Sequence, residues 1–394
     1  MRILIVSQYF YPETFMINEI ATGLVKRGHS VDVVTGIPNY PKGEIYEGYE
    51  NRLIENYCGV TIFRTRIRPR HTGSLNLFLN YMSFMKKAKK TIRRINKTYD
   101  IVFCYEPSPI FQLTPTLYAK KRFKCSAILM CCDQWPESLK ARGLSKGFVF
   151  NAVSRYCIKN LNKCDFILNI APSFVEYNHR QNKVPYSKMN WIIQPSNDFY
   201  FDRIDSPKNT IDIVFAGNIG TVQNVEQIIT ARSMVKHDNL IVHIFGDGSE
   251  KAKCVELVDK LQLNNKVLFY GKVDQALLRD HYRKMDACLL TLSGKSSIGN
   301  TIPSKFANYL SLGLPIIAAI GGDCKQIIEN NHLGLCCPPD DTEALADLMN
   351  EYCERKDFYA SYGEKARSFF LQNCSTDVFL GKLELLFSSF CNQN

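Results

Sequence analysis

The sequence predicts an α/β protein built from two doubly wound, Rossmann-like domains. Short, apolar, β-branched segments alternate with helical segments along almost the whole chain. This alternation is typical of parallel sheets that helices cover on both faces. It stops at a polar stretch over residues 195–209 and then restarts. A chain of 394 residues is also too long for one ordinary core, which favours two domains.

The first half contains seven apolar runs that we interpret as buried strands. They lie at residues 2–6, 31–35, 60–65, 100–104, 127–131, 166–170 and 191–194. Helical spacing of apolar residues predicts the helices 15–26, 75–96, 109–122 and 148–162. We place the first domain at residues 1–197.

The second half repeats the pattern after the polar stretch. Its predicted strands are 211–216, 240–245, 267–270, 287–292, 315–319 and 334–337. The tail, residues 341–390, is helical without a strand signal. We place the second domain at 210–375 and expect the helix of 376–394 to pack back toward the first domain. Ligands bind at the carboxyl ends of strands in such sheets, so the natural site is a cleft between the two domains.

The net charge of +11 comes from one region. Between Asn56 and Tyr99 there is no acidic residue, and the basic region 64–97 holds eleven Lys and Arg residues. Apolar residues at near-helical spacing precede most of these cations: Leu77, Phe78, Tyr81, Met82 and Met85. The pattern favours a helix lying on an anionic membrane surface. A solvated helix is the alternative, and nucleic-acid binding is disfavoured because no recognition motif accompanies the charge.

Other signals point to the cytoplasm and against a metal site. The first apolar run is four residues long, too short for a signal peptide, and no run approaches a membrane span. The 15 cysteines include no C-x-x-C and no Cys/His cluster with zinc spacing. We expect reduced, buried thiols and a protein that at most touches a membrane from the cytoplasm.

Two glycine turns follow strands of the second half. Gly217, Asn218 and Gly220 come after strand 211–216, and Gly246 and Asp247 come after strand 240–245. Such turns let a backbone approach an anionic ligand at the start of a helix. Each could equally be a plain tight turn.

Residues 300–317 give the strongest signal. Pro303 suits the first turn of a helix. Ser304 and Lys305 would then offer free amides and one cation to a diphosphate. Asn308 follows about one turn later. The alternative is a short buried helix with a solvent-facing lysine.

In the first half, Asp133 follows strand 127–131 beside Trp135 and Glu137. A carboxylate there could act in acid/base chemistry or bind a hydroxyl, or it could only cap its loop. The loop at residues 7–18 contains no glycine, which argues against a nicotinamide dinucleotide enzyme.

Taken in order, these segments resemble glycosyltransferase family 4, whose fold is GT-B. The resemblance is greatest to the bacterial polysaccharide branch that includes N-acetyl-L-fucosamine transferases (WbuB-like). It is carried by residues 2–49 and by the stretches CCDQWPESLKARGL, IVFAGNIGTVQ, FGDGSE and TIPSKFANYLSLGLPIIAAIGGD.

The resemblance implies a retaining, metal-independent transferase without cofactor, and the sequence contains no D-x-D motif. Its donor would be a nucleoside diphosphate sugar, expected to be UDP-linked. Its acceptor would be a polyprenyl diphosphate-linked saccharide of O-antigen or capsule synthesis. Asp133 and Lys305 would be catalytic. Donor-binding residues would be Gly217, Asn218, Gly220, Gln223, Gly246, Asp247, Gly271, Asn300, Pro303, Ser304, Lys305 and Asn308. Acceptor-binding residues would be Tyr11, Pro12, Asn18, Arg68, Arg70, Trp135 and Glu137.

The chain departs from the family pattern at charged positions. The usual pair of glutamates reads Asn300 and Asn308, and the usual cationic pair reads Asn218 and Gln223. A departing diphosphate needs positive charge, so we expect Lys305 and the helix amides to supply it. Two alternatives stay open: a UDP-sugar 2-epimerase of the same fold, and a non-catalytic sugar-nucleotide-binding subunit.

Overall fold

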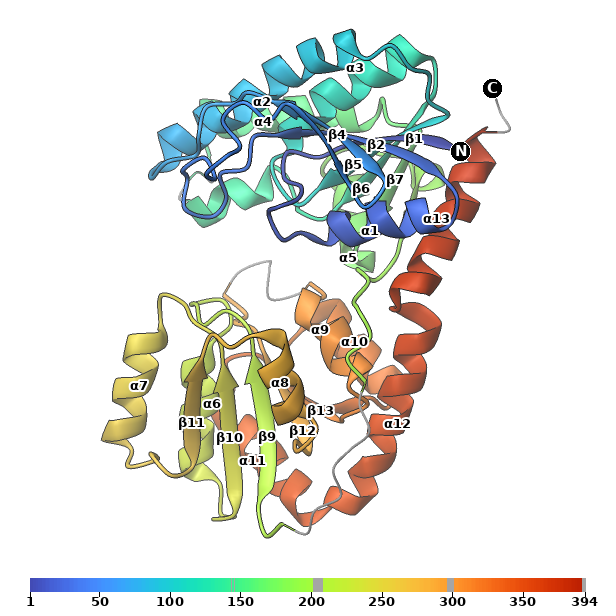
Figure 1. Cartoon of the computed structure of the whole chain (residues 1–394). Coiled ribbons are helices and arrows are strands. Elements are labelled where there is room, and N and C mark those ends of the chain that lie inside the picture. The colour runs from blue at the N-terminus through green and yellow to red at the C-terminus, as the bar shows by residue number, and fades with distance from the viewer. Residues whose placement is uncertain (143, 145, 201–207, 296–300, 392–394) are drawn as a thin grey trace. The chain divides into compact units, whose positions relative to one another are not determined.

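The computed structural model describes residues 1–142, 144, 146–200, 208–295 and 301–391 (Figure 1). The chain divides into two compact units. Unit 1 comprises Met1–Ile192 and Phe379–Asn394, and unit 2 comprises Ile193–Val378. Each unit is a parallel-sheet α/β domain and is described by itself.

Unit 1 contains an eight-stranded sheet in the order β3-β4-β2-β1-β5-β6-β7-β8. Its strands are β1 (Arg2–Val6), β2 (Ser30–Gly36), β3 (Ile54–Tyr57), β4 (Val60–Thr65), β5 (Ile101–Glu106), β6 (Ser126–Cys131), β7 (Phe166–Asn169) and β8 (Met189–Trp191). The pairing of β3 with β4 is antiparallel, and the other pairings are parallel. The helices are α1 (Met16–Lys26), α2 (Ser74–Arg94), η1 (Ile110–Gln112), α3 (Leu113–Phe123), η2 (Glu137–Arg142), α4 (Phe148–Leu161), α5 (Pro172–Arg180), η3 (Tyr186–Lys188) and α13 (Thr376–Cys391).

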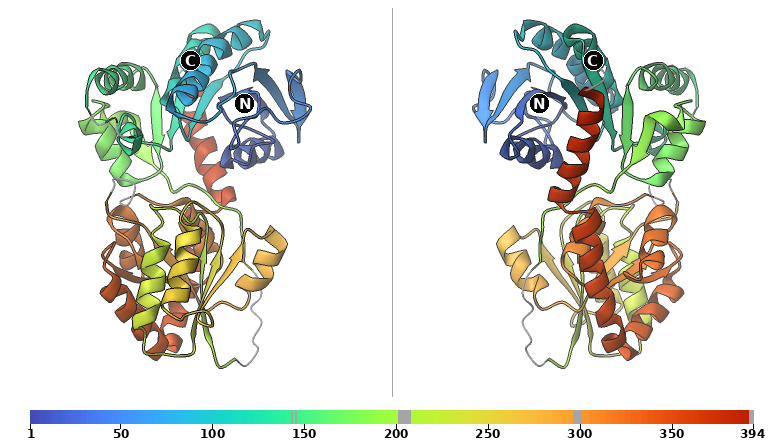
Figure 2. Two further views of the ribbon diagram at one scale, coloured as in Figure 1. Left: turned by 90° about the vertical axis from the view of Figure 1, so that its left-hand side faces the viewer. Right: turned by 90° about the vertical axis from the view of Figure 1, so that its right-hand side faces the viewer.

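Unit 2 contains a six-stranded parallel sheet in the order β11-β10-β9-β12-β13-β14. Its strands are β9 (Ile211–Ala216), β10 (Leu240–Phe245), β11 (Val267–Gly271), β12 (Ala287–Thr291), β13 (Ile316–Ala319) and β14 (Gly334–Cys337). The helices are α6 (Val225–Met234), α7 (Lys251–Lys260), α8 (Gln275–Tyr282), α9 (Ser304–Ser311), α10 (Gly322–Asn330), α11 (Thr342–Glu354) and α12 (Lys356–Asn373). Helices lie on both faces of this sheet (Figure 2), as the continuous apolar strands require.

The unit boundary lies a few residues before the predicted one. Ser196 donates its backbone N–H to Cys374 O at 3.0 Å, and its hydroxyl bonds Asn308 Oδ1. These bonds place residues 193–200 with unit 2. From Phe379 onward α13 belongs to unit 1, where Glu384 pairs with Arg27 at 2.7 Å.

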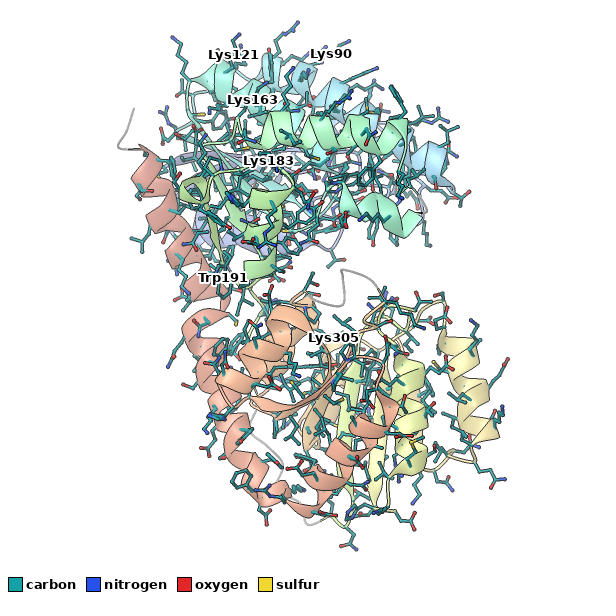
Figure 3. All side chains as sticks on the ribbon, turned by 180° about the vertical axis from the view of Figure 1, so that it is seen from behind. Lys90, Lys121, Lys163, Lys183, Trp191 and Lys305 are labelled. Carbon is teal, nitrogen blue, oxygen red and sulfur yellow. The ribbon has the colours of Figure 1, made fainter. Side chains whose placement is uncertain are left out.

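Helix α2 packs part of its apolar side on unit 1 and leaves part of it exposed. Leu77 and Tyr81 are buried, and Phe84 packs in a core cluster of unit 1 with residues of β1, β2 and β5. Phe78 of the same stripe is 44% exposed, so only part of the stripe packs in the core. Helix α2 presents exposed cations such as Lys90 on its outer side (Figure 3). Two cations of the basic region are ion-paired: Arg64 is buried against Glu55, and Lys97 pairs with Asp32 at 2.8 Å.

Within the described ranges, no helix combines the length and the apolar character that crossing a bilayer would need.

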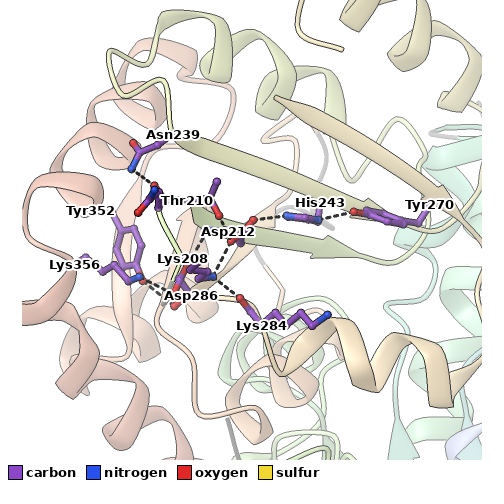
Figure 4. Close-up of polar contacts among 11 residues, drawn as sticks. Lys208, Thr210, Asp212, Asn239, His243, Tyr270, Lys284, Asp286, Tyr352 and Lys356 are labelled. Atoms are coloured by element: carbon purple, nitrogen blue, oxygen red, sulfur yellow. Dashed lines mark hydrogen bonds and ion pairs between the residues drawn. The ribbon is translucent and has the colours of Figure 1, made fainter. Parts of the chain in front are cut away.

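A polar network lies at the amino ends of β9 and β12 (Figure 4). Asp212 accepts hydrogen bonds from His243 at 2.8 Å, from Lys208 at 2.7 Å and from Thr210 at 2.8 Å. Asp286 accepts from the backbone N–H of Asp212 at 2.8 Å. Burial alone would raise the pKa of Asp212, but the hydrogen bonds from His243, Lys208 and Thr210 outweigh it and hold the pKa well below its ordinary value.

Replacing Asp212 by asparagine is expected to lower the free energy of unfolding by about 2 kcal/mol at pH 7, because partly buried donors lose a charged acceptor. The folded-state pKa lies below the unfolded one, so this stabilisation is complete above about pH 4 and is lost as the pH falls toward the folded-state value. Urea unfolding should therefore show a difference from wild type that shrinks in acid. The exposed Asp238→Asn change is the control, and a difference that stays constant from pH 7 to pH 3 would contradict this account.

Candidate functional site

Helix α9 brings Lys305 to the carboxyl end of β9. Tyr309 lies one turn after Lys305, is fully buried, and its hydroxyl accepts a hydrogen bond from Ala216 N at 2.8 Å. This bond anchors α9 to the last residue of β9. The ammonium of Lys305 then lies 3.7 Å from the ring centroid of Phe215 (Figure 3). The lysine is thus held over the strand end. The alternative interpretation, a solvent-facing lysine, does not hold.

Lys305 Nζ is buried without a hydrogen-bond partner among the residues that the structure describes. Burial lowers the pKa of Lys305 to about 7. A cation in this environment is destabilised until an anion joins it, because in the described part of the chain only an aromatic ring compensates its charge. The position is therefore suited to an anionic ligand.

Gly217 leaves the space in front of this lysine open. A Cβ at Gly217 would lie 3.0 Å from Lys305 Nζ, and the residue has a φ of +150°, which favours glycine. A side chain at this position would cover the ammonium. Gly217 and Lys305, both predicted to bind a diphosphate, are therefore neighbours in the structure.

The second glycine turn supports the first one. Gly246 N bonds Gly271 O at 2.8 Å, and Gly217 N bonds Phe245 O at 2.9 Å, so the ladder continues past the strand ends. A Cβ at Gly246 would lie 1.8 Å from Gly217 O. Gly246 is therefore required for close packing of the two turns, and Gly271 supplies the acceptor that fixes it.

Asn218 and Gln223, where the resemblance to family 4 implies a cationic pair, bond each other. Asn218 Nδ2 donates to Gln223 Oε1 at 3.0 Å, and both lie against Gly220, where a Cβ would be 2.7 Å from Asn218 Nδ2. They bring no charge to the turn. Lys305 is consequently the cation that the described residues place at this strand end.

The start of α9 is open to a ligand. Pro303 has an extended ψ of 145° and is the residue before the first turn, not within it as predicted. No side chain caps the helix, and Ser304 is exposed. Backbone N–H groups of the first turn are thus available to an anion.

Three further residues predicted to bind the donor have different environments. Asn308 Oδ1 is taken by the Ser196 hydroxyl, which leaves only its Nδ2 group as a donor. The side chain of Asp247 is exposed, lies 3.7 Å from Lys251 and accepts from Gly248 N at 2.9 Å. Asn300 lies outside the described residues.

A polar cavity of about 410 Å³ lies beside Gly220. Its described lining comes from α6, α7 and the ends of β12 and β14, with Glu226, Lys253 and Asp340 among the charged groups. Neither Gly217 nor Lys305 is in that lining. Its charged groups are of both signs and largely surface-lying, so this cavity is less suited to an anionic ligand than the position of Lys305.

In unit 1, Asp133 lies just after β6. Its Oδ1 accepts from Gln134 N at 2.9 Å and from the Ser138 hydroxyl. Burial raises the pKa of Asp133, and these hydrogen bonds oppose the rise. The carboxylate is partly exposed and held in one orientation, as an acid/base or hydroxyl-binding group must be.

Glu106 is a neighbouring carboxyl group that the sequence analysis missed. It ends β5, next to β6, and both its carboxyl oxygens are buried without a hydrogen-bond partner in the described part of the chain. Burial raises the pKa of Glu106 well above its ordinary value, and Asp133 adds to the effect. The predicted strand ended two residues early; the rule used for Asp133, a carboxylate at a strand's carboxyl end, would have found it.

Two further residues predicted to bind the acceptor, an aromatic one and a charged one, follow Asp133 in the sequence. Trp135 is buried, with its ring centroid 5.9 Å from that of Phe111. Glu137 begins η2 and pairs with Lys140 at 2.5 Å. Trp135 thus belongs to an apolar surface, while Glu137 lies at a solvated edge.

The loop after β1 is held mainly by its own bonds. Tyr11 stacks on Tyr57 with centroids 3.8 Å apart, and Pro12 follows through a cis peptide bond. Asn18 accepts from Tyr11 N at 3.0 Å and donates to Glu13 O at 2.7 Å. Both polar groups of Asn18 therefore serve the loop, which makes Asn18 a positioning residue more than a ligand contact.

Arg68, Arg70 and Glu13 lie around the ends of β1, β2 and β4. Arg68 is exposed and donates to Asn76 Oδ1 at 3.0 Å. Arg70 lies 5.2 Å from the ring centroid of Tyr40. Glu13 Oε1 accepts from the backbone N–H groups of Asn39 at 2.8 Å and Tyr40 at 2.7 Å. Sequence analysis missed Glu13, although it is the one carboxylate of its loop.

Replacing Glu13 by glutamine is expected to raise stability at pH 8, because Oε1 can still accept both amides. Burial raises the pKa of Glu13 from 4.5 to about 7. The folded state therefore binds the proton more tightly, so stability is greatest below the unfolded pKa and falls as the pH rises through 7. The penalty removed is on the order of 3 kcal/mol.

Thermal unfolding at pH 8 and pH 5 measures this effect. The gain from Glu13→Gln should be large at pH 8 and small at pH 5. The exposed Glu47→Gln change is the control. A variant that is less stable than wild type at pH 8 would contradict the burial of a costly carboxylate.

Sequence comparisons relate this chain to glycosyltransferases. Residues 196–369 match the family described as "Glycosyl transferases group 1". The chain is 26% identical to the probable glycosyltransferase WbjE of Pseudomonas aeruginosa, over 77% of each chain. It is 23% identical to the putative colanic acid biosynthesis glycosyl transferase WcaI of Escherichia coli, over 88% of this chain and 90% of that one.

Solved structures share the fold over the full length. Sucrose-phosphate synthase from Thermosynechococcus elongatus superposes with a TM-score of 0.78 at 14% identity, with 100% of both chains covered. Anabaena HepE in complex with UDP and glucose gives a TM-score of 0.70 at 14% identity, covering 99% of this chain and 100% of that one. The predicted fold class, GT-B with two parallel-sheet α/β domains, is thereby confirmed.

Proposed function

We propose that this chain, a glycosyltransferase whose residues 196–369 match the group 1 family, transfers a sugar from a nucleoside diphosphate donor in the synthesis of a bacterial surface polysaccharide. The observation that carries the proposal is the buried, unpaired ammonium of Lys305 beside Gly217 and the open start of α9. A leaving diphosphate is the anion that this arrangement fits. The polysaccharide pathway is supported by relatives named for colanic acid and for O-antigen chain synthesis.

The donor is a UDP-linked sugar in this proposal. HepE, which shares the fold, has been solved in complex with UDP-glucose. We further propose retention of anomeric configuration and catalysis without a metal ion, in keeping with the resemblance to family 4. The moving sugar would be an amino or deoxyamino hexose, as in the WbuB-like branch.

The acceptor is a polyprenyl diphosphate-linked saccharide held by unit 1, with Asp133 facing its reacting hydroxyl. The orientation of Asp133 by Ser138 and Gln134 supports this role. Exposed cations of α2 and of the preceding loop would hold unit 1 on the anionic inner face of the plasma membrane. Arg64 and Lys97 are excluded from that surface role because they are ion-paired.

Incubation with a panel of nucleotide sugars and a prenyl diphosphate-linked saccharide tests the proposal. Mass spectrometry should detect an acceptor heavier by one sugar, equally in the presence and absence of a chelator. NMR of the new linkage should show the anomeric configuration of the donor. Lys305→Ala serves as the inactive control.

The same experiment separates the two alternatives. A free epimerised sugar nucleotide without transfer would indicate a UDP-sugar 2-epimerase. Saturable UDP binding without any product would indicate a sugar-nucleotide-binding subunit. Either result would contradict the transferase proposal.

A further inference from the structure

Unit 1 contains an apolar cavity of about 270 Å³ next to the Asp133 loop. Its walls come from the first turns of α2, from η1 and from the start of α4. Phe78, Tyr81, Phe111 and Trp135 form an aromatic side, and Val149 lies on the opposite helix. The rings of Phe78 and Phe111 meet edge to face with centroids 6.3 Å apart. The cavity is therefore a built, concave apolar surface.

Two residues that line this cavity are exposed apolar side chains from different helices, and a third exposed apolar residue adjoins one of them in the sequence. Leu75 of α2 is 71% exposed, Val149 of α4 is 48% exposed, and Phe148 beside it is 85% exposed. Single exposed apolar residues are common, but several converging around an apolar cavity mark a binding surface. The ligand must itself be apolar, because the lining offers almost no polar group.

Two exposed cations lie close to lining residues along the chain or through a side-chain bond. Arg68 is exposed and bonds Asn76, which stands between the lining residues Leu75 and Leu77. Lys146 is exposed two residues before Phe148. A molecule that combines a hydrocarbon with an anionic group satisfies both features.

The cavity also lies close in the sequence to Asp133, the candidate acid/base group. Trp135 forms part of the wall, and Asp133 is two residues earlier on the same tight loop. The wall of the cavity therefore lies two residues along the chain from the carboxylate. We propose that this cavity binds the first isoprenoid units of the acceptor's polyprenyl diphosphate, with the diphosphate at Arg68 and Lys146. The inference rests on the proposed function and assigns a lipid-binding subsite to it.

Trp135 makes the test direct, because the chain has only two tryptophans. In a Trp191→Phe background, Trp135 is the single indole, and it lines the cavity. Titration with farnesyl diphosphate should give a saturable change in its fluorescence, whereas inorganic diphosphate should not. The double change Leu75→Ser and Phe78→Ser should weaken the affinity by about tenfold or more, since two apolar contacts are lost.

Ile54→Ser is the matched control, because Ile54 is an apolar residue of unit 1 that is 66% exposed on the edge strand β3. Its affinity should equal that of the parent. Equal binding of farnesyl diphosphate by the double variant and the parent would overturn the proposal. A second outcome would also overturn it: the parent does not bind farnesyl diphosphate, and the double variant loses binding to anionic vesicles. In that case the exposed apolar residues insert into the bilayer and do not bind an isoprenoid. No donor is present in this assay, so its failure is distinct from a failure to transfer sugar.

Discussion

Replacing Lys305 by alanine is expected to lower kcat by about 100- to 1000-fold, because in the proposed reaction the charge that develops on the leaving diphosphate would lose its buried cation. The ammonium lies over Phe215 and beside Gly217, with no acceptor among the described residues. Removing it leaves no unpaired partner behind, so the fold should be retained. The exposed Lys260→Ala change is the control for a lost surface charge. Turnover near that of wild type would exclude the role of Lys305.

The pH dependence of donor binding tests the same residue without catalysis. With a pKa of about 7, the free lysine loses its proton as the pH rises above neutrality. A bound diphosphate favours the charged form, so UDP affinity should fall with increasing pH above about 7. Calorimetry should show this fall in wild type and a flat profile in Lys305→Ala. If UDP affinity depended on pH equally in both proteins, the dependence would come from a group other than Lys305.

Most strands could be predicted because they are short apolar runs whose burial on both faces requires no other signal. Strand β8 (Met189–Trp191) has two exposed residues and lies earlier than the predicted 191–194. The edge strand β3 was missed because its sequence, Ile-Glu-Asn-Tyr, carries no such run, and its exposure alternates. Its antiparallel pairing with β4 depends on a neighbour in space. The order of the strands in each sheet is likewise a long-range property that local patterns do not encode.

Helix α2 shows how one sequence pattern allows two interpretations, and its contact with a membrane stays a prediction. Its apolar and basic stripes were predicted, but an amphipathic helix can pack its apolar side on lipid or on its own protein. Leu77, Tyr81 and Phe84 cover unit 1 itself. Only the contacts of the folded chain distinguish these two cases.

The sequence predicted which residues lie at the candidate site, but it did not predict their burial or their pKa values. Lys305 was placed correctly at the start of a helix, but its burial depends on Phe215 and Gly217, which come from a distant part of the chain. The high pKa of Glu106 and of Glu13 has the same origin, because burial by distant segments causes both shifts. Such shifts are set by tertiary packing, which composition and spacing do not reveal.

Replacing Asp133 by asparagine is expected to reduce kcat by about 100-fold or more while UDP affinity stays unchanged, because in the proposed reaction the carboxylate acts on the acceptor. Asparagine keeps the size of the side chain and can still accept from Gln134 N. The loss should therefore be one of chemistry and not of folding. Unfolding midpoints within experimental error of wild type would establish that control.

Ser138 provides the sharper test, because its hydroxyl lowers the pKa of Asp133 against the effect of burial. Ser138→Ala should raise that pKa further, and the acid limb of the kcat/KM profile should shift to higher pH. Activity that depends on the carboxylate form falls as the pH drops through this pKa, so the variant loses activity at a pH where wild type is still active. A merely structural serine would lower activity at every pH without moving the limb. An unchanged limb, or an Asp133→Asn variant that keeps more than about a tenth of wild-type turnover, would remove Asp133 from the reaction and leave its loop with a purely architectural role.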